Sequence, residues 1–176
     1  MGKKYILTDD VIDFNGHTLH RIKAVRDFDC VKAGDLGGFI ESEKNLDHDG
    51  DAWVFVNAKA FGNARLSENA WAFGNARLFE NAWASGDARL LGNARVSGDA
   101  RVYKPSDIAV IQGFGSEFRA TSFFRCVDGL VRCQCGCFYG SIEEFRAKVR
   151  ETHGNSKYAK EYLMIADLME LHFKED

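Results

Sequence analysis

The chain has 176 residues, of which 45% are hydrophobic, so it can bury one substantial core; its formal net charge is −3 and its sequence pI is near 6.0. This balance argues against direct, general nucleic-acid binding. No apolar run is long enough to span a bilayer, and five cysteines, an odd number crowded mostly into one segment, do not resemble a secreted disulfide framework. We expect a cytoplasmic protein without membrane contact, whose first residues are a mature cytosolic start.

The N-terminal segment contains two β-like runs, KYILT and HTLHRIKAV. Between them stands Asn15-Gly16, a dipeptide typical of two-residue hairpin turns. We predict that residues 1–30 form a β-hairpin cap on one end of the structure that follows.

Residues 31–49 follow a six-residue register only loosely. Traced backward from the regular repeats, Leu36 falls at an aliphatic place, and Ile40 and Leu46 fall at alanine places. We expect an irregular first coil here, as terminal repeats are often atypical. An acidic rim runs from this segment into the first regular six, and such a rim is more often a solvated edge than a binding site: Glu41, Glu43, Asp47, Asp49 and Asp51.

Residues 50–103 form nine consecutive sixes without insertion: GDAWVF, VNAKAF, GNARLS, ENAWAF, GNARLF, ENAWAS, GDARLL, GNARVS and GDARVY. Each six has Asn or Asp at its second place, alanine at its third and an aliphatic residue at its fifth. A period of six drifts around a 3.6-residue helix, whereas short strands joined by tight corners accommodate it. The residues before each alanine suit such corners. We therefore predict stacked coils with the aliphatic places facing inward.

These sixes resemble the hexapeptide-repeat proteins, which fold as a left-handed parallel β-helix with three sixes per coil. The flanks GDLGGFIESEKNL and GCFYGSIEEFRAKVRETHG are similar to those of phage and prophage hexapeptide-repeat proteins of unassigned function. The resemblance implies a mainly β protein with a left-handed parallel β-helix over residues 31–110. It also implies a homo-oligomer.

Residues 111–176 predict a C-terminal β-hairpin and two α-helices. Asp128-Gly129 lies between two apolar runs and indicates a two-residue hairpin turn. Ser141 followed by Glu144 is a capping box that opens a helix through about residue 152, with Gly154 as its stop. A second helix is expected from about residue 156 to 173, and its apolar stripe needs a surface to cover.

Four cysteines of the hairpin suggest a metal site at first. With a two-residue turn, however, Cys126, Cys133, Cys135 and Cys137 project from one side of the sheet, where cysteine serves as a small hydrophobe. Zinc-type spacing is absent, so we expect no metal and no cofactor. A catalytic pair of Cys137 and His153 lacks a third, orienting group.

The faces of the coils supply the candidate binding residues, because three sixes per coil stack residues eighteen apart. One face is aromatic and is either a partner or oligomer interface or the floor for the C-terminal helices: Trp53, Phe55, Trp71, Phe73 and Leu91. A second face carries a basic ladder of Lys59, Arg77 and Arg95. The ladder suits phosphates or a carboxylate-rich partner. Alternatively, it is a solvated face that stacks on Phe61 and Phe79.

The function expected from these features is a non-enzymatic binding protein. The resemblance to phage proteins implies a target in the host, a protein or nucleoprotein complex, so we expect an inhibitor of a bacterial defence system, for example an anti-CRISPR protein. Two alternatives stay open. An acyl-coenzyme A transferase of the hexapeptide-repeat family needs a surface histidine and an acceptor loop, but the nine sixes contain neither, and His48 is the only histidine near them. The other alternative is a sponge whose basic ladder holds a phosphorylated small molecule.

Overall fold

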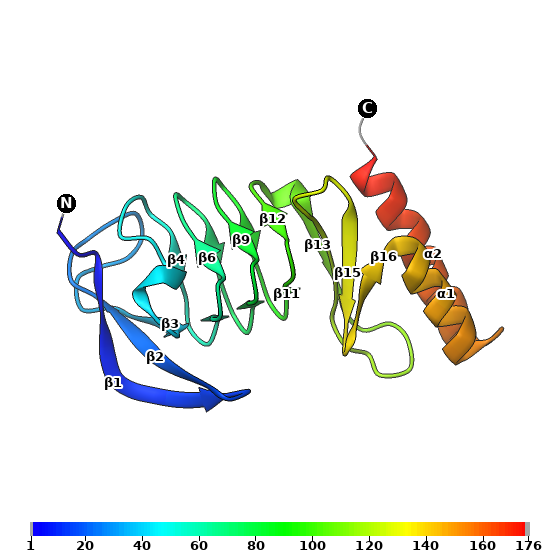
Figure 1. The fold of residues 1–176 in the computed structure, drawn as a ribbon, viewed down its shortest axis with the longest axis horizontal. Coiled ribbons are helices and arrows are strands. Elements are labelled where there is room, and N and C mark those ends of the chain that lie inside the picture. The colour runs from blue at the N-terminus through cyan, green and yellow to red at the C-terminus, as the bar shows by residue number, and fades with distance from the viewer. Residues whose placement is uncertain (1, 175–176) are drawn as a thin grey trace.

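The computed structural model describes residues 2–174 and begins with the predicted hairpin. Strands β1 (Tyr5–Phe14) and β2 (His17–Ala24) are antiparallel, and Asn15 and Gly16 in the turn have positive φ. Strand β2 also pairs with β3 (Leu36–Ile40), which continues into the solenoid in the order β1-β2-β3-β5-β8-β11. The hairpin therefore extends one sheet of the solenoid and projects alongside the coils (Figure 1).

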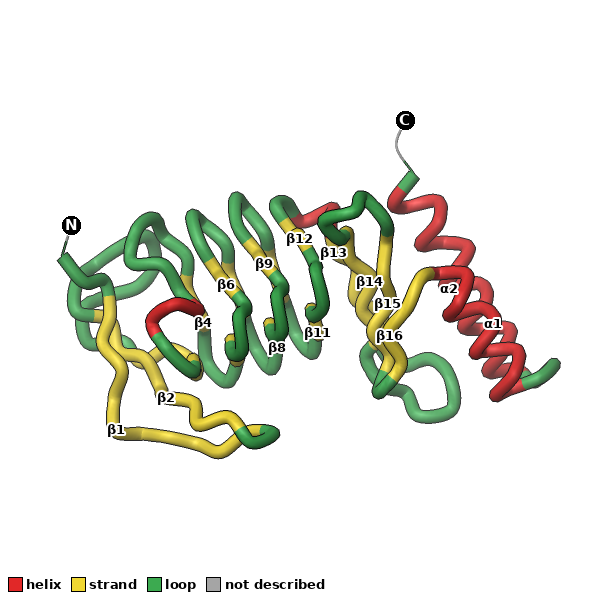
Figure 2. The backbone as a smooth tube through the Cα atoms, in the orientation of Figure 1, coloured by secondary structure: helices red, strands yellow, loops and turns green. Residues whose placement is uncertain are grey.

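The sixes form a β-solenoid, as predicted. Its nine short strands are β4 (Trp53–Val54), β5 (Lys59–Ala60), β6 (Arg65–Leu66), β7 (Trp71–Ala72), β8 (Arg77–Leu78), β9 (Trp83–Ala84), β10 (Arg89–Leu90), β11 (Arg95–Val96) and β12 (Arg101–Val102). Each pairs in parallel with the strand eighteen residues away. Three parallel sheets result, separated by turns (Figure 2).

The repeat dictates this geometry through three of its six places. The residue at the first place has positive φ in all nine sixes, from Gly50 to Gly98, which turns the chain at each corner and suits the glycines found at most of these places. The alanine at the third place and the aliphatic residue at the fifth are at most 1% exposed in every six. The interior of the solenoid is therefore a stack of small and aliphatic side chains.

The irregular first coil is offset from its predicted register. Ile40 pairs with Ala60, and Leu46 forms a bridge with Leu66, so both occupy aliphatic places twenty residues from their partners instead of eighteen. Leu36, assigned to an inward place, is 60% exposed. The predicted register of this coil was wrong because two extra residues lie between Leu46 and β4. Counting backward in sixes ignores these two residues, so every position before them is assigned two places away from its true place.

A four-stranded antiparallel sheet closes the far end of the solenoid. It comprises β13 (Ile108–Ile111), β14 (Thr121–Arg125), β15 (Val131–Cys135) and β16 (Phe138–Ser141), in that order. Phe124 packs with the coil interior, whereas Phe123 belongs to a separate core with the helices. The sheet therefore lies between the coils and the helices (Figure 1). Short 3₁₀ turns at Glu43–Asn45 and Pro105–Asp107 flank the coils.

The hairpin of β14 and β15 has a three-residue turn instead of the predicted two. Cys126 N donates to Leu130 O at 2.9 Å, and Phe123 pairs with Cys133. One extra residue reverses which side chains share a face. Cys126 thus joins the coil core and Cys133 the helix core, so the prediction that all four cysteines project from one side was wrong.

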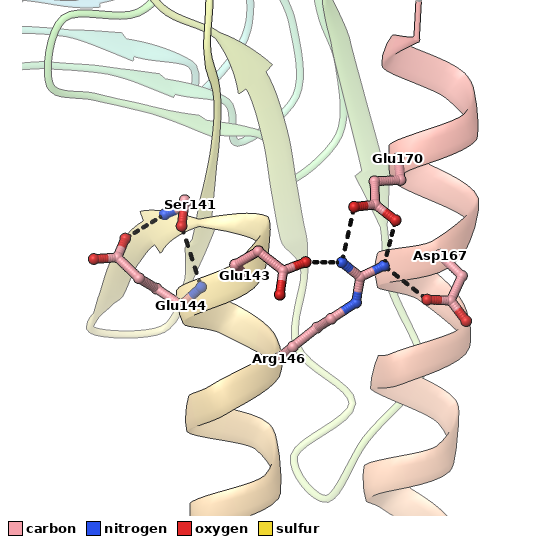
Figure 3. Close-up of polar contacts among 6 residues, drawn as sticks. All are labelled: Ser141, Glu143, Glu144, Arg146, Asp167 and Glu170. Atoms are coloured by element: carbon pink, nitrogen blue, oxygen red, sulfur yellow. Dashed lines mark hydrogen bonds and ion pairs between the residues drawn. The ribbon is translucent and has the colours of Figure 1, made fainter.

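Two helices, α1 (Ile142–His153) and α2 (Lys157–Phe173), cover the outer face of this sheet and leave the coils uncovered. The capping box is confirmed: Glu144 N donates to Ser141 Oγ at 3.1 Å, and Ser141 N donates to Glu144 Oε2 at 2.7 Å (Figure 3). Gly154 ends α1 with φ of 55°. Between residues 2 and 174, no helix combines the length and apolar character needed to cross a membrane.

Arg146 links the two helices. Its side chain is 9% exposed and lies between α1 and α2 (Figure 3). Its guanidinium donates to Glu143 on its own helix and to Asp167 (2.7 Å) and Glu170 (2.7 and 3.0 Å) on α2. This fork of charged hydrogen bonds fixes the register of α1 against α2.

Candidate functional site

The basic ladder forms as predicted. Parallel pairing places Lys59 beside Arg77, and Arg77 beside Arg95, on the sheet that contains the hairpin. The tip of the hairpin lies over the first two: the Phe14 ring is 5.1 Å from Lys59 Nζ and 4.8 Å from Arg77 Cζ. Lys59 is further held by a 2.8 Å hydrogen bond to Asn57 O. It is therefore the least available of the three cations.

The cations of the basic ladder were expected to stack on Phe61 and Phe79, but the structure shows a different arrangement. Phe61 and Phe79 stack on each other, with ring centroids 5.4 Å apart and planes 5° apart. Phe14 instead supplies the ring that meets Lys59 and Arg77. Sequence reasoning missed this contact, because it depends on how far the hairpin reaches along the coils.

Arg77 and Arg95 open into a cavity of about 260 Å³, which we call the basic cavity. Its side-chain walls are Asn75, Arg77, Asn93, Arg95 and Arg119. Arg95 Nη1 donates to Gly136 O at 2.9 Å, whereas its buried Nε has no hydrogen-bond partner among the described residues. The cavity therefore brings two predicted ladder residues together with a third arginine from the loop before β14.

The positive charge in the basic cavity is only partly balanced. Arg119 pairs with Glu117 at 3.2 Å, but within residues 2–174 no carboxylate forms an ion pair with Arg77 or Arg95. Burial, followed by the charge of Arg95, lowers the pKa of Arg77, and burial, followed by the charge of Arg77, lowers the pKa of Lys59. A guanidinium stays protonated despite such a shift. The cavity is therefore suited to an anion, whose negative charge would relieve this repulsion.

A second cavity of about 290 Å³, the helix-side cavity, lies between the sheet and the helices. Its wall is mainly apolar, with Phe138, Phe145, Val149 and Tyr162. The Phe145 ring is 5.8 Å from Phe138 and 5.6 Å from Tyr162, between ring centroids. Burial, followed by the nearby Cys135, raises the pKa of Tyr162 to about 12, so its hydroxyl stays protonated at neutral pH.

The rim of the helix-side cavity holds polar and titratable groups: Ser116, Glu117, Arg119, Cys135, Cys137, Lys148, Thr152 and His153. The fold therefore brings together the Cys137 and His153 considered from the sequence, on one cavity. Cys137 is exposed, and His153 packs near the Tyr162 ring at 5.7 Å. No group of three or more metal-binding side chains occurs in the part of the chain that the structure describes.

The loop from residue 112 to 120 helps to form both cavities. Gly115 N donates to Glu161 Oε2 at 2.8 Å, which ties the loop to α2. Gly115 has φ of 73°, and a side chain there would place its Cβ 2.0 Å from the Tyr162 ring. The loop carries Arg119 into place without any repeat, helix or strand pattern, so the sequence offered no signal for it beyond the glycines.

The aromatic face is exposed only in part. Trp53 is 1% exposed, because Phe28 and Tyr5 of the N-terminal segment pack against it with ring centroids 5.3 and 6.1 Å away. It is therefore a core residue and not part of an interface. Phe73 and Leu91 remain 45% and 54% exposed.

The middle of the aromatic face is occupied by rings that contact one another edge-on or at a tilt. Trp71 is half-buried: Phe55 lies 5.1 Å away, and the Arg89 guanidinium lies 4.4 Å above its ring. Phe55 also contacts Phe73 at 5.5 Å. The C-terminal helices do not cover this face, so its exposed edge stays open in the described chain.

The acidic rim does not act as one patch, because three of its members are engaged separately. Glu41 accepts from Gly62 N at 2.6 Å and contacts His17 Nδ1 at 3.1 Å. Glu43 pairs with Lys3 at 2.5 Å, and Asp47 pairs with Arg65 at 2.8 Å. These acids, together with Asp49 and Asp51, border the loops where the N-terminal segment meets the first coil.

His48 has a structural environment. Its ring stacks on Tyr5 with centroids 4.3 Å apart, and its Nδ1 accepts from Lys4 N at 3.2 Å. The nine sixes contain no histidine and no inserted loop. The surroundings of His48 therefore tie it to the packing of the N-terminal segment.

Neither a protein-family model nor a curated protein sequence matches this chain.

Proposed function

We propose that the protein is a non-enzymatic binding protein that holds a phosphorylated small molecule in the basic cavity. The observation that carries the proposal is the pairing of Arg77 with Arg95 along the solenoid, without a carboxylate partner for either among the described residues. Arg119 faces the same cavity. Three guanidinium groups around one polar cavity match the charge and geometry of phosphate oxygens.

The setting of this activity follows from the resemblance of the flanking segments to phage proteins. In that setting the ligand is a phosphorylated signal molecule of the host, and its removal from solution is the antagonist function. The resemblance supports the setting, whereas the arginines support the chemistry of the ligand.

The proposal is tested by isothermal titration calorimetry, in which inorganic pyrophosphate is added to the protein and its affinity is measured. We expect binding to the natural protein and a loss of about tenfold or more in affinity for Arg77→Gln, because about 1.4 kcal/mol of charged hydrogen bonding corresponds to a factor of ten. Arg77 is chosen because Arg95 also holds the backbone at Gly136.

Arg89→Gln is the matched control. It removes the same charge from the equivalent place of β10, a strand of another sheet of the solenoid, where the guanidinium stacks on Trp71 outside the basic cavity. We expect this variant to bind pyrophosphate as the natural protein does. Absence of pyrophosphate binding, or equal losses in both variants, would show that the cavity is not the ligand site.

A second candidate function, self-association, is favoured by the exposed edge of the aromatic face. Phe73 and Leu91 lie on one side of the solenoid without cover from the helices, and Val56, the residue after Phe55, is also 49% exposed. Exposed apolar columns of this kind are typical of interfaces. We propose that this edge binds a second copy of the chain.

Light scattering tests this second candidate. The double variant Phe73→Ser, Leu91→Ser is expected to reduce the mass from that of an oligomer to that of a single chain, while its far-ultraviolet circular dichroism spectrum stays that of the folded chain. The control is Leu168→Ser on α2, which removes a side chain of similar exposure (53%) from a different surface. A monomeric natural protein, or an oligomer that survives the double change, would contradict self-association through this edge.

A further inference from the structure

We infer that the phosphorylated ligand is a nucleoside diphosphate or triphosphate, with its phosphates in the basic cavity and its base in the helix-side cavity. This inference rests on the proposed function and names the class of ligand. It is carried by the position of the two cavities on either side of one turn and by the contrast in their chemistry.

The two cavities meet at Arg119. This side chain lines both of them, and Gly136 lines the basic cavity while Cys135 and Cys137 on either side of it line the helix-side cavity. The β15–β16 turn therefore separates the two spaces by a single residue of backbone. A ligand that bridges them passes the Arg119 guanidinium, which is 45% exposed.

The absence of a side chain at Gly136 permits this arrangement. A Cβ built there would lie 2.4 Å from Arg119 Nη1, so any other residue would displace the guanidinium from the turn. Gly136 also has φ of 60°, a conformation that glycine adopts without strain. Gly136 O accepts from Arg95 Nη1 at 2.9 Å, which ties the turn to the basic cavity.

The helix-side cavity has the chemistry expected for a flat heteroaromatic ring. Its aromatic lining consists of Phe138, which is half-buried, and of Phe145 and Tyr162, which are buried; aromatic side chains stack on nucleobases whatever their identity. Its rim presents Ser116 and Thr152, which can hydrogen-bond to the edge of a base. Inorganic phosphate or a sugar phosphate would leave this apolar wall unused.

The two cavities also differ in how far their positive charges are balanced by carboxylates. The basic cavity contains Arg77 and Arg95 without paired carboxylates in the described chain, whereas on the helix-side rim Lys148 pairs with Glu151 at 2.8 Å and Arg119 with Glu117 at 3.2 Å. The unbalanced positive charge is thus confined to one end of the combined space. A nucleotide has the same asymmetry, with its charge at one end and a neutral ring at the other.

The test compares ADP with inorganic pyrophosphate in isothermal titration. ADP is expected to bind at least tenfold more tightly than pyrophosphate to the natural protein. Cys137→Trp, which fills the helix-side cavity from an exposed position, is expected to reduce the affinity for ADP to that for pyrophosphate and to leave pyrophosphate binding unchanged. Cys30→Trp, at an exposed cysteine of the N-terminal segment, is the matched control and should leave both affinities unchanged.

A second variant, His153→Ala, removes a side chain that lines the same cavity at the end of α1. It is expected to weaken ADP binding at least fivefold and to leave the affinity for pyrophosphate unchanged. Equal affinities of the natural protein for ADP and pyrophosphate would overturn the inference and leave the proposed function intact. Unchanged ADP binding in folded Cys137→Trp and His153→Ala would also overturn it. Failure of both ligands to bind would overturn the proposed function itself.

Discussion

Leu90→Ala is expected to lower the free energy of unfolding by about 2–5 kcal/mol, because it removes a fully buried side chain from the interior of a coil. The place below Leu90 in the same column is Ala72, which is too small to fill the space left behind. Backbone hydrogen bonds between stacked coils, such as Phe73 N to Leu90 O at 2.8 Å, limit how far the coils can collapse. The residual cavity should therefore persist and add to the cost.

Leu91→Ala provides the matched control for this prediction. The two leucines are adjacent and chemically identical, but Leu91 faces outward and is 54% exposed. Measured on the dissociated single chain, its replacement is expected to change the free energy of unfolding by about 0.5 kcal/mol or less. Urea unfolding followed by circular dichroism measures both, and similar losses in the two variants would contradict the assignment of the fifth place to the interior.

Asn45→Ala is expected to be the second strongly destabilising change, at about 2–4 kcal/mol. Asn45 is fully buried, and its side chain joins the first coil to the next. Its Nδ2 donates to Gly62 O at 3.1 Å and to Ala64 O at 2.8 Å, while its Oδ1 accepts from Ser42 N at 2.9 Å. Alanine would leave these backbone groups without that partner in a buried position, which costs more than the loss of an exposed hydrogen bond.

Asn63→Ala is the corresponding control. Asn63 is exposed, and its Nδ2 donates to Asn81 Oδ1 at 3.2 Å, so water can replace the amide after the change. We expect a loss of about 0.5 kcal/mol or less in the same urea experiment. If Asn45→Ala lowered the free energy of unfolding no more than Asn63→Ala does, the bonds of Asn45 would contribute no more to the closure of the solenoid than the exposed contact between Asn63 and Asn81.

The bonds of Asn45 also give a structural role to the segment GDLGGFIESEKNL, which precedes the regular sixes. Gly38 lies so close to the first regular coil that a Cβ would be 2.4 Å from Ala58 O. Asn45 then joins this segment to the next coil through the bonds described above. The segment closes the open end of the solenoid, where backbone groups would otherwise lack partners.

The sequence by itself determined the elements whose cause is local. The sixes predicted the solenoid and its inward places, because glycine-type corners and buried alanines recur at a fixed spacing. Asn15-Gly16 predicted the first hairpin, and the capping box of Ser141 with Glu144 predicted the start of α1. The six-residue repeat also predicted the stacking of Arg77 on Arg95, since residues eighteen apart must lie in neighbouring coils.

Features that depend on one extra residue, or on contacts between distant segments, were decided by the tertiary structure. A two-residue insertion shifts Ile40 and Leu46 from their predicted places, and a longer turn puts Cys126 on the opposite face from Cys133. The sequence did not predict either feature, because neither one alters the local residue pattern. Trp53 is buried by an N-terminal segment whose path the repeats do not specify. Arg119 reaches the ladder from an unpatterned loop. The candidate site exists only where that loop, the end sheet and the coils meet, and no local period encodes such a meeting.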